Sequence, residues 1–128
     1  MEEVMIVHVK VSENISYLKG KEMDVCMLPF TGTVEGPYFN GKVLDGGVDT
    51  QMIYHDGRFQ LSARYMLEGT DYKGNPCRVF IENNGKAMDQ CVPSIVTDSS
   101  ELQFLSEQEL FSKVIATQDS VTVFIYKK

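Results

Sequence analysis

Apolar and polar residues alternate most clearly in the stretch "RFQLSARYMLE", residues 58–68. Every second side chain from Phe59 to Leu67 is apolar, while most of the positions between them carry polar or charged groups. A period of two residues indicates a β-strand with two different faces. The preceding Asp56-Gly57 is a favoured two-residue turn between strand-forming runs. The pattern therefore predicts a hairpin that turns at Asp56-Gly57.

Most of the remaining chain also predicts short strands, separated by turns rich in Gly, Pro and Asn. The expected strands cover residues 4–11, 21–28, 31–36, 50–55, 58–68, 77–82, 110–117 and 120–127. Asn84-Gly85 predicts a second turn, and Gln118-Asp119 joins the last two strands in a hairpin. Residues 99–106 carry the helix signal, with Ser100 and Gln103 at capping-box spacing. We expect one all-β domain, residues 1–128, forming an antiparallel barrel or sandwich of about eight or nine strands with one short helix.

The polar face of residues 58–68 leaves two arrangements open. In a sandwich that face is solvated. In a closed barrel of about eight strands, the two faces become the outside and an interior that can hold one small ligand. The polar face carries Arg64 and Glu68 deep in the strand, whereas Tyr65 lies on the apolar face and is expected in the core.

Composition and charge narrow the classes of function. The 128 residues suffice for a sizeable core, and the net charge of −6 argues against a nucleic-acid surface. The longest apolar runs, such as 121–126, are too short to span a membrane, and the acidic start "MEEVMIV" is unlike a secretion signal. We expect a cytoplasmic protein without a nucleic-acid or membrane partner. Because the run 121–126 is too apolar for a solvated strand, we also expect a homodimer.

Metal and cofactor sites find little support in the sequence. His8 and His55 lie on different expected strands without ligands at suitable spacing. Cys26, Cys77 and Cys91 form no C-x-x-C pair and are expected to be reduced and largely buried. Phosphate-binding glycine motifs and a nucleophile elbow are also missing. We therefore expect neither a metal nor a cofactor.

The glycine-rich segment "GPYFNGKVLDGGVDTQ", residues 36–51, leads to the candidate site. A hairpin turning at residues 56–57 should bring Asp49 nearly opposite Arg64, and we expect the two side chains to form an ion pair. Arg64 would then hold an anionic or carbonyl oxygen of a ligand, and Asp49 would orient the ligand or move a proton. The alternative is a structural ion pair that closes the barrel. Further candidate ligand-binding residues near turns and strand ends are Gly46, Gly47, Tyr54, Asp56, Glu68 and Glu82.

Three stretches carry a resemblance to a known family: "TGTVEGPYFNGKVLDGGVDTQ", "DGRFQLSARYMLEGTD" and "RVFIENNG". They resemble the family called domain of unknown function 3237, small bacterial proteins with a calycin-like β-barrel. The most specific parts are the residues 35–49 and 63–65. The resemblance implies a barrel of this kind but no established reaction. It places Gly46, Gly47, Asp49, Asp56, Arg64 and Tyr65 on the family's characteristic positions.

Two classes of function follow from these observations. The first is a site for a small polar or anionic organic molecule at the barrel mouth, in a carrier or in an enzyme that works by acid–base or electrostatic means. The second is a non-catalytic structural or assembly module whose barrel is filled by side chains. Open space beside Asp49 and Arg64 favours the first class, and a filled interior favours the second.

Overall fold

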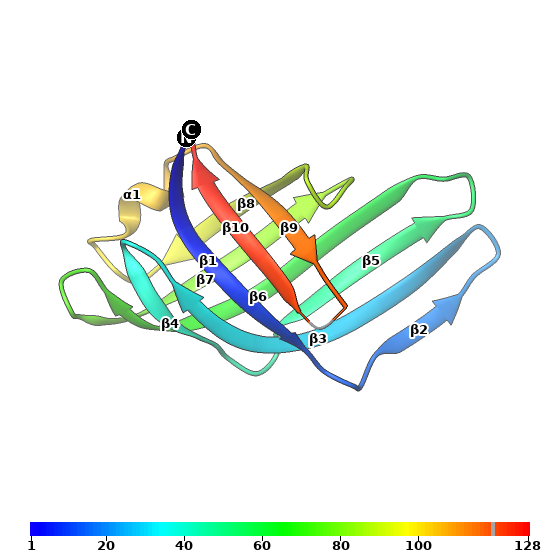
Figure 1. Cartoon of the computed structure of the whole chain (residues 1–128), viewed down its shortest axis with the longest axis horizontal. Coiled ribbons are helices and arrows are strands. Elements are labelled where there is room, and N and C mark those ends of the chain that lie inside the picture. The colour runs from blue at the N-terminus through cyan, green and yellow to red at the C-terminus, as the bar shows by residue number, and fades with distance from the viewer. Residues whose placement is uncertain (119) are drawn as a thin grey trace.

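The computed structural model describes residues 1–118 and 120–128 and consists mainly of antiparallel strands (Figure 1). The elements are β1 (Glu2–Val11), β2 (Ser16–Lys19), β3 (Met23–Glu35), β4 (Phe39–Val43), β5 (Val48–Tyr54), β6 (Phe59–Asp71), β7 (Pro76–Gly85), β8 (Cys91–Thr97), α1 (Gln103–Ser106), β9 (Leu110–Ala116) and β10 (Val121–Lys127). No helix within these two ranges is long and apolar enough to cross a membrane.

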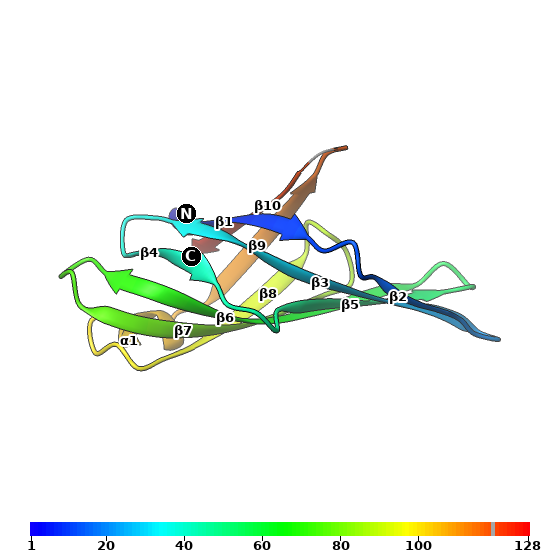
Figure 2. The same ribbon diagram turned by 90° about the horizontal axis from the view of Figure 1, so that it is seen from below.

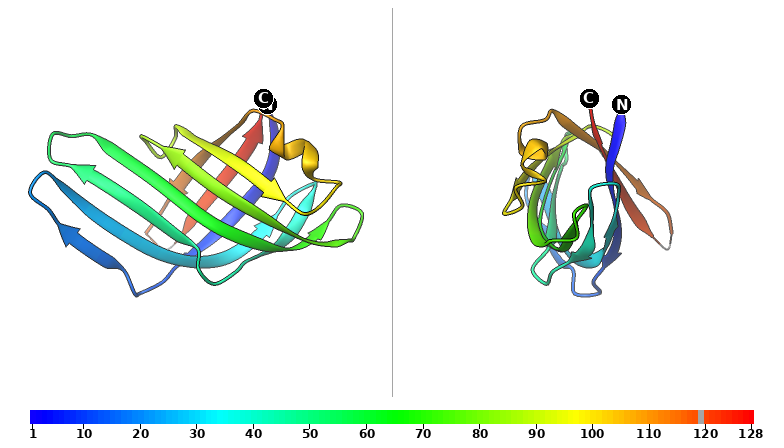
Figure 3. Two further views of the ribbon diagram at one scale, coloured as in Figure 1. Left: turned by 180° about the vertical axis from the view of Figure 1, so that it is seen from behind. Right: turned by 90° about the vertical axis from the view of Figure 1, so that its left-hand side faces the viewer.

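Eight strands close into a barrel because β1 pairs with both β10 and β3. Around the barrel the order is β1, β10, β9, β8, β7, β6, β4 and β3. The pairing of β1 with β10 brings the two chain termini together at one end of the barrel, as Figure 3 shows. The expected all-β antiparallel barrel with one short helix is confirmed, and the sandwich that the alternation of residues left open is not formed.

The strands β3 and β6 have 13 residues each and extend beyond the barrel at one end. Each of them therefore has different neighbouring strands at its two ends. β4 lies between them at one end, and β5 lies between them at the other. β2 pairs with the same end of β3 as β5 does. The strands β2 and β5, with the adjoining parts of β3 and β6, form a sheet that projects from the barrel, here called the extension (Figure 2).

The strand β3 is continuous where the sequence predicts an interruption at Pro29. Pro29 lacks a backbone N–H, but its carbonyl accepts a hydrogen bond from the N–H of Ser12, just past the end of β1, at 2.8 Å. Three residues later, Gly32 has φ +150° and passes so close to the backbone of His8 that a Cβ atom would collide with its carbonyl oxygen. The prediction that the strand ends before Pro29 is wrong, because these long-range contacts carry β3 from the extension into the barrel.

The turn predictions succeed where the pair of residues lies between strands. Gly57, with φ +99°, donates its N–H to the carbonyl of Tyr54 at 3.1 Å, and β5 pairs with β6 across this hairpin. The predicted turn at Asn84-Gly85 is wrong, because both residues pair inside β7 and the chain turns at 86–90. β9 and β10 form the predicted last hairpin, and Asp119 lies outside the described residues.

The helix lies within the expected range 99–106, but its start differs from the predicted capping box. Leu102 occupies the N-cap, and its N–H donates to the hydroxyl of Ser99 at 3.3 Å. The same hydroxyl donates to Asp71 at 2.9 Å, so a buried pair ties the start of α1 to the end of β6.

The apolar face of β6 points into the barrel and its polar face points outward. Leu61, Ala63, Tyr65 and Leu67 are buried, whereas Arg64 is exposed. Large side chains fill the end of the barrel around β4 and α1, where Phe39, Met5, Leu67, Ile81, Leu102 and Leu105 are fully buried. The opposite end, toward the extension, is less completely filled.

Candidate functional site

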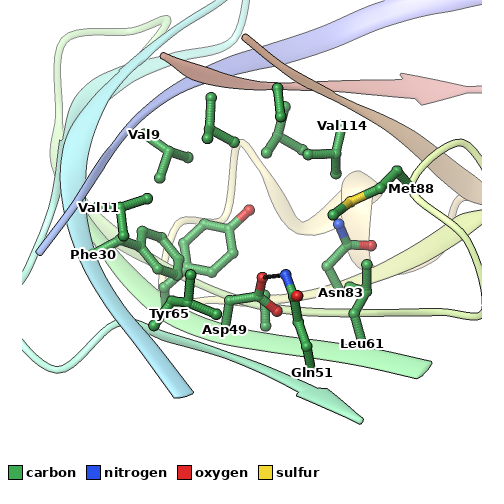
Figure 4. Close-up of a pocket in the computed structure, with 15 residues that line it drawn as sticks. Val9, Val11, Phe30, Asp49, Gln51, Leu61, Tyr65, Asn83, Met88 and Val114 are labelled. Atoms are coloured by element: carbon green, nitrogen blue, oxygen red, sulfur yellow. Dashed lines mark hydrogen bonds between the residues drawn. The ribbon is translucent and has the colours of Figure 1, made fainter. Parts of the chain in front are cut away.

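A pocket with a volume of about 220 Å³ opens inside the barrel at its less filled end (Figure 4). Its wall consists mainly of aliphatic side chains from β1, β3, β6, β9 and β10. The polar groups at the pocket come from Asp49 and Gln51 of β5, Tyr65 of β6 and Asn83 of β7. The pocket is thus an apolar cavity with a few polar groups, the usual form of a small-molecule site.

Asp49 is held at the pocket by the loop that contains Gly46 and Gly47. The carbonyl of Gly47 accepts a hydrogen bond from the N–H of Phe30 at 2.9 Å. A Cβ atom at position 47 would lie 3.2 Å from the Cβ of Tyr65, so glycine allows this loop to pass directly behind the pocket wall. The glycine-rich segment therefore both turns the chain and positions Asp49.

The two carboxylate oxygens of Asp49 have different surroundings. Oδ2 accepts a hydrogen bond from Nε2 of Gln51 at 2.8 Å. Oδ1 is buried and has no hydrogen-bond partner. Burial raises the pKa of Asp49, and the hydrogen bond from Gln51 opposes that shift. Asp49 therefore binds a proton more tightly in the folded protein than in the unfolded chain.

Tyr65, which the alternation predicted in the core and the family resemblance placed on a characteristic position, also lines the pocket. Its ring packs edge-to-face against Phe30, with the ring centroids 5.1 Å apart. Its hydroxyl group is buried and has no partner. Burial and the negative charge of Asp49 raise the pKa of Tyr65, so the phenol stays neutral. The sequence does carry a sign of this role: Tyr65 is the one residue with a hydroxyl group among the apolar residues that alternate along 59–67.

Asn83 differs from these two residues because its polar atoms are already paired. Its amide nitrogen donates to the hydroxyl of Ser112 at 2.9 Å, and that hydroxyl lies 3.1 Å from the amide oxygen. Both residues are buried. This pair links β7 to β9 at the edge of the pocket and leaves Asp49, Gln51 and Tyr65 as the groups free to meet a ligand.

The predicted ion pair between Asp49 and Arg64 does not form. The register of the hairpin places Val48 opposite Arg64 and Asp49 opposite Ala63. Because successive residues of a strand point to opposite faces, Asp49 faces the interior and Arg64 faces outward. Nε of Arg64 instead lies 3.0 Å from Oε2 of Glu82, and the Arg64 side chain is 64% exposed.

The structure also separates the other candidate residues. Glu68 pairs with Arg78 on the outer face at 2.8 Å, and Glu82 pairs with Arg64 there. At the tip of the hairpin, Arg58 pairs with Asp56 at 2.9 Å and lies over the ring of Tyr54. Gly46 and Gly47 border a second, more open hollow of about 340 Å³ beside Lys10 and Thr31. Of the residues proposed for the site, Asp49 is the one that lines the barrel pocket.

Within residues 1–118 and 120–128, no group of three or more His, Cys, Asp or Glu side chains is placed to hold a metal ion. The three cysteines Cys26, Cys77 and Cys91 are buried and free.

Comparisons with known proteins agree with the barrel architecture. A UPF0311 protein of Clostridium acetobutylicum is 47% identical over 55 residues, which cover 43% of this chain and 32% of the relative. The match therefore spans about a third of that relative's length. A crystal structure of a protein with unknown function from Clostridium acetobutylicum has 25% identity and a TM-score of 0.82, covering 98% of this chain and 94% of that chain. A β-barrel-like protein from Acinetobacter baumannii, 17% identical, has a TM-score of 0.81 over 98% of this chain and 93% of its own, and shows the shared fold.

The family resemblance noted in the sequence is confirmed by a direct match. The model of the family described as "protein of unknown function (DUF3237)" matches residues 1–118. Since this match covers nearly the whole chain, the protein belongs to the DUF3237 family.

Proposed function

We propose that the protein binds a small organic molecule in the barrel pocket, with Asp49 as its main polar contact. The observation that supports this proposal is the unpaired, buried Oδ1 of Asp49 in a pocket that is otherwise mostly apolar. Buried polar atoms in folded proteins nearly always have a partner. Leaving one without a partner costs about 1–3 kcal/mol. A ligand that donates a hydrogen bond to Oδ1 removes that cost.

The chemistry of the pocket changes the kind of ligand that the sequence suggested. A polar or anionic molecule was expected, and the anionic option rested on Arg64 lying beside Asp49. Arg64 lies outside the barrel and is paired with Glu82, so it offers no positive charge to the pocket. The pocket suits a molecule with an apolar body and a hydrogen-bond donor near Asp49.

The alternative of a filled assembly module fits only part of the barrel. The end around Phe39 and Leu105 is filled by side chains, but the end that contains Asp49 keeps a volume of about 220 Å³. A purely structural barrel gains nothing from this space, since an unfilled cavity lowers stability. Binding is therefore the function that the pocket supports best.

A thermal-shift screen tests the proposal, because a molecule that binds the native state raises Tm. The panel contains single-ring molecules with matched positive, neutral and negative groups. The wild-type protein and the Arg64→Ala variant should be stabilised by the same compounds, since Arg64 is outside the pocket. The Asp49→Asn variant should respond to a different set. The proposal fails if no compound shifts the wild-type Tm, or if Arg64→Ala abolishes the response.

A further inference from the structure

We propose that the pocket selects a cation, namely a molecule with an apolar body and a single ammonium group that binds Asp49. This inference rests on the proposed binding function and specifies the chemical class of its ligand. It is carried by three features of the pocket: the balance of charge, the remaining hydrogen-bond acceptors and the apolar wall.

The balance of charge favours a positive ligand. Asp49 is the only carboxylate among the described residues that line the pocket, and no Lys, Arg or His lines it. A carboxylate in apolar surroundings without a counter-ion carries a desolvation cost that a cation offsets. An anionic ligand would instead add a second negative charge at short range, where a low dielectric strengthens the repulsion.

The available hydrogen-bonding atoms are mainly acceptors, which is what an ammonium group needs. A primary ammonium has three N–H donors. Oδ1 of Asp49 has no partner, and Gln51 uses its amide nitrogen to bind Oδ2, which leaves its amide oxygen beside the carboxylate (Figure 4). The hydroxyl oxygen of Tyr65 is a third possible acceptor. Asn83 is excluded from this set because it already pairs with Ser112.

Access to these acceptors requires side-chain movement, since Oδ1 of Asp49 and the hydroxyl of Tyr65 are both buried. Met88 lines the same pocket and is 37% exposed. Methionine is unbranched and adapts readily to a ligand. We expect a different rotamer of this side chain to enlarge the pocket without a change in the barrel backbone.

The wall provides the apolar part of the site. Val9, Val114 and Val123 line the pocket with other aliphatic side chains, and Phe30 and Tyr65 add an aromatic pair. Aliphatic surface favours a hydrocarbon body, and aromatic rings also attract cations. A single-ring amine combines both properties.

The experiment compares probes of one shape and different charge by calorimetric titration at pH 7. The probes are benzylamine, benzyl alcohol and benzoate, with cyclohexylmethylamine and cyclohexylmethanol as a second shape. In the wild-type protein each amine should bind at least about tenfold more tightly than its alcohol, and benzoate should bind most weakly. Asp49→Asn should remove the preference for the amines and leave the alcohols within about threefold, while Arg64→Ala should keep the wild-type order.

The outcomes separate this inference from the proposed function. If an alcohol binds as tightly as its amine, the preference for a cation is overturned, but binding in the pocket stands. If none of the probes binds the wild-type protein, the cation inference is overturned, and the broader thermal-shift panel decides the proposed function. The wild-type comparison alone decides the preference, so the result does not depend on how well any variant folds.

Discussion

At the scale of single residues, Asp49 departs from the pattern that the rest of the barrel follows. Elsewhere in β5 and β6 the inward positions at the pocket are apolar or neutral, such as Leu61 and Ala63. Asp49 places a carboxylate among them and leaves one oxygen unpaired. Local violations of this kind concentrate at functional sites, where stability is exchanged for binding or chemistry.

The first prediction concerns the stability cost of Asp49. Its pKa is raised in the folded protein, so the native state holds a proton more tightly than the unfolded chain does. The resulting decrease in the free energy of unfolding is absent at a pH below the pKa of the unfolded chain. It is complete at a pH above the pKa of the folded protein. Asp49→Asn should therefore increase the free energy of unfolding at pH 7 by about 1–2 kcal/mol, with the gain shrinking as the pH falls through the folded pKa. Urea denaturation across a pH series measures this effect.

Asp56 is the matched control, because its pKa is lowered by the backbone N–H and side chain of Arg58. The Asp56 carboxylate therefore contributes to stability instead of reducing it. This contribution is present at a pH above the pKa of the unfolded chain and is lost as the pH falls through the pKa of the folded protein. Asp56→Asn should not stabilise the protein at pH 7. A loss of stability in Asp49→Asn at pH 7 would show that Oδ1 of Asp49 also has a partner.

The second prediction concerns the hydroxyl of Tyr65. Because this group is buried without a partner, Tyr65→Phe should keep or increase the free energy of unfolding, by up to about 1 kcal/mol. Tyr65→Ala also removes the ring that packs on Phe30 and should cost about 3–5 kcal/mol. Chemical denaturation of both variants distinguishes the two contributions. A large loss in Tyr65→Phe would reveal a hydrogen bond to the hydroxyl.

At the scale of elements, the long strand β3 depends on one close backbone contact. Gly32 packs against the backbone of His8 where β3 pairs with β1. We predict that Gly32→Ala lowers the free energy of unfolding by about 3 kcal/mol or more, because a Cβ atom collides with a backbone carbonyl at a positive φ. Gly46→Ala is the control, since Gly46 also has a positive φ but no atom lies within 4 Å of its added Cβ. Equal losses in the two variants would mean that the collision is relieved by movement of the strands.

The elements show which features the sequence could predict. The hairpin at Asp56-Gly57 depends on local turn chemistry and on alternation in its own two strands, so it was predictable. The continuity of β3 through Pro29 depends on β1 and β5, which lie far away in the sequence. Asn84-Gly85 has a turn composition, but its place in β7 is fixed by pairing with β6 and β8.

The candidate site was predicted in part for a related reason. Alternation identified the two faces of β6, and the glycine segment identified Asp49. Which face of β6 lies inside depends on how the barrel closes. In addition, Asp49 pairs with Ala63 and not with Arg64, because the register of β5 and β6 differs by one residue from the expected register. This difference of one residue places Arg64 on the surface instead of beside Asp49 in the interior.

At the scale of the whole molecule, the apolar run in β10 is partly explained by the barrel itself. Val123 and Ile125 are buried in the core, and Tyr126 stacks on Phe111 with ring centroids 5.1 Å apart. Two strongly exposed aliphatic side chains lie on one face of β8, where Val92 is 62% and Val96 is 66% exposed, while β2 carries a single one, Leu18, at 62%. The surface of β8 is therefore the better candidate for association.

We propose, as the last prediction, that the protein forms a homodimer through the outer face of β8. Burying Val92 and Val96 against a second copy removes apolar surface from water, which favours association. Sedimentation velocity at micromolar concentration should show a dimer, and the double substitution Val92→Lys with Val96→Lys should give a monomer of unchanged fold. Lys10→Ala, on the distant β1, is the control. A wild-type monomer under these conditions contradicts the prediction.

The contact between β8 and β9 has a further consequence for the barrel. Within the described residues these strands share one residue pair, Cys91 with Ser112, whereas β6 and β7 share ten. Asn83 and Met88 add hydrogen bonds to β9 at the same place, through Ser112 and Val114. Since this contact borders the pocket and has the fewest paired residues around the barrel, we expect the wall to open there more often than elsewhere. We therefore expect the opening frequency of this contact to set the residence time of a bound molecule and Asp49 to set its affinity, so that substitutions can change the two properties independently.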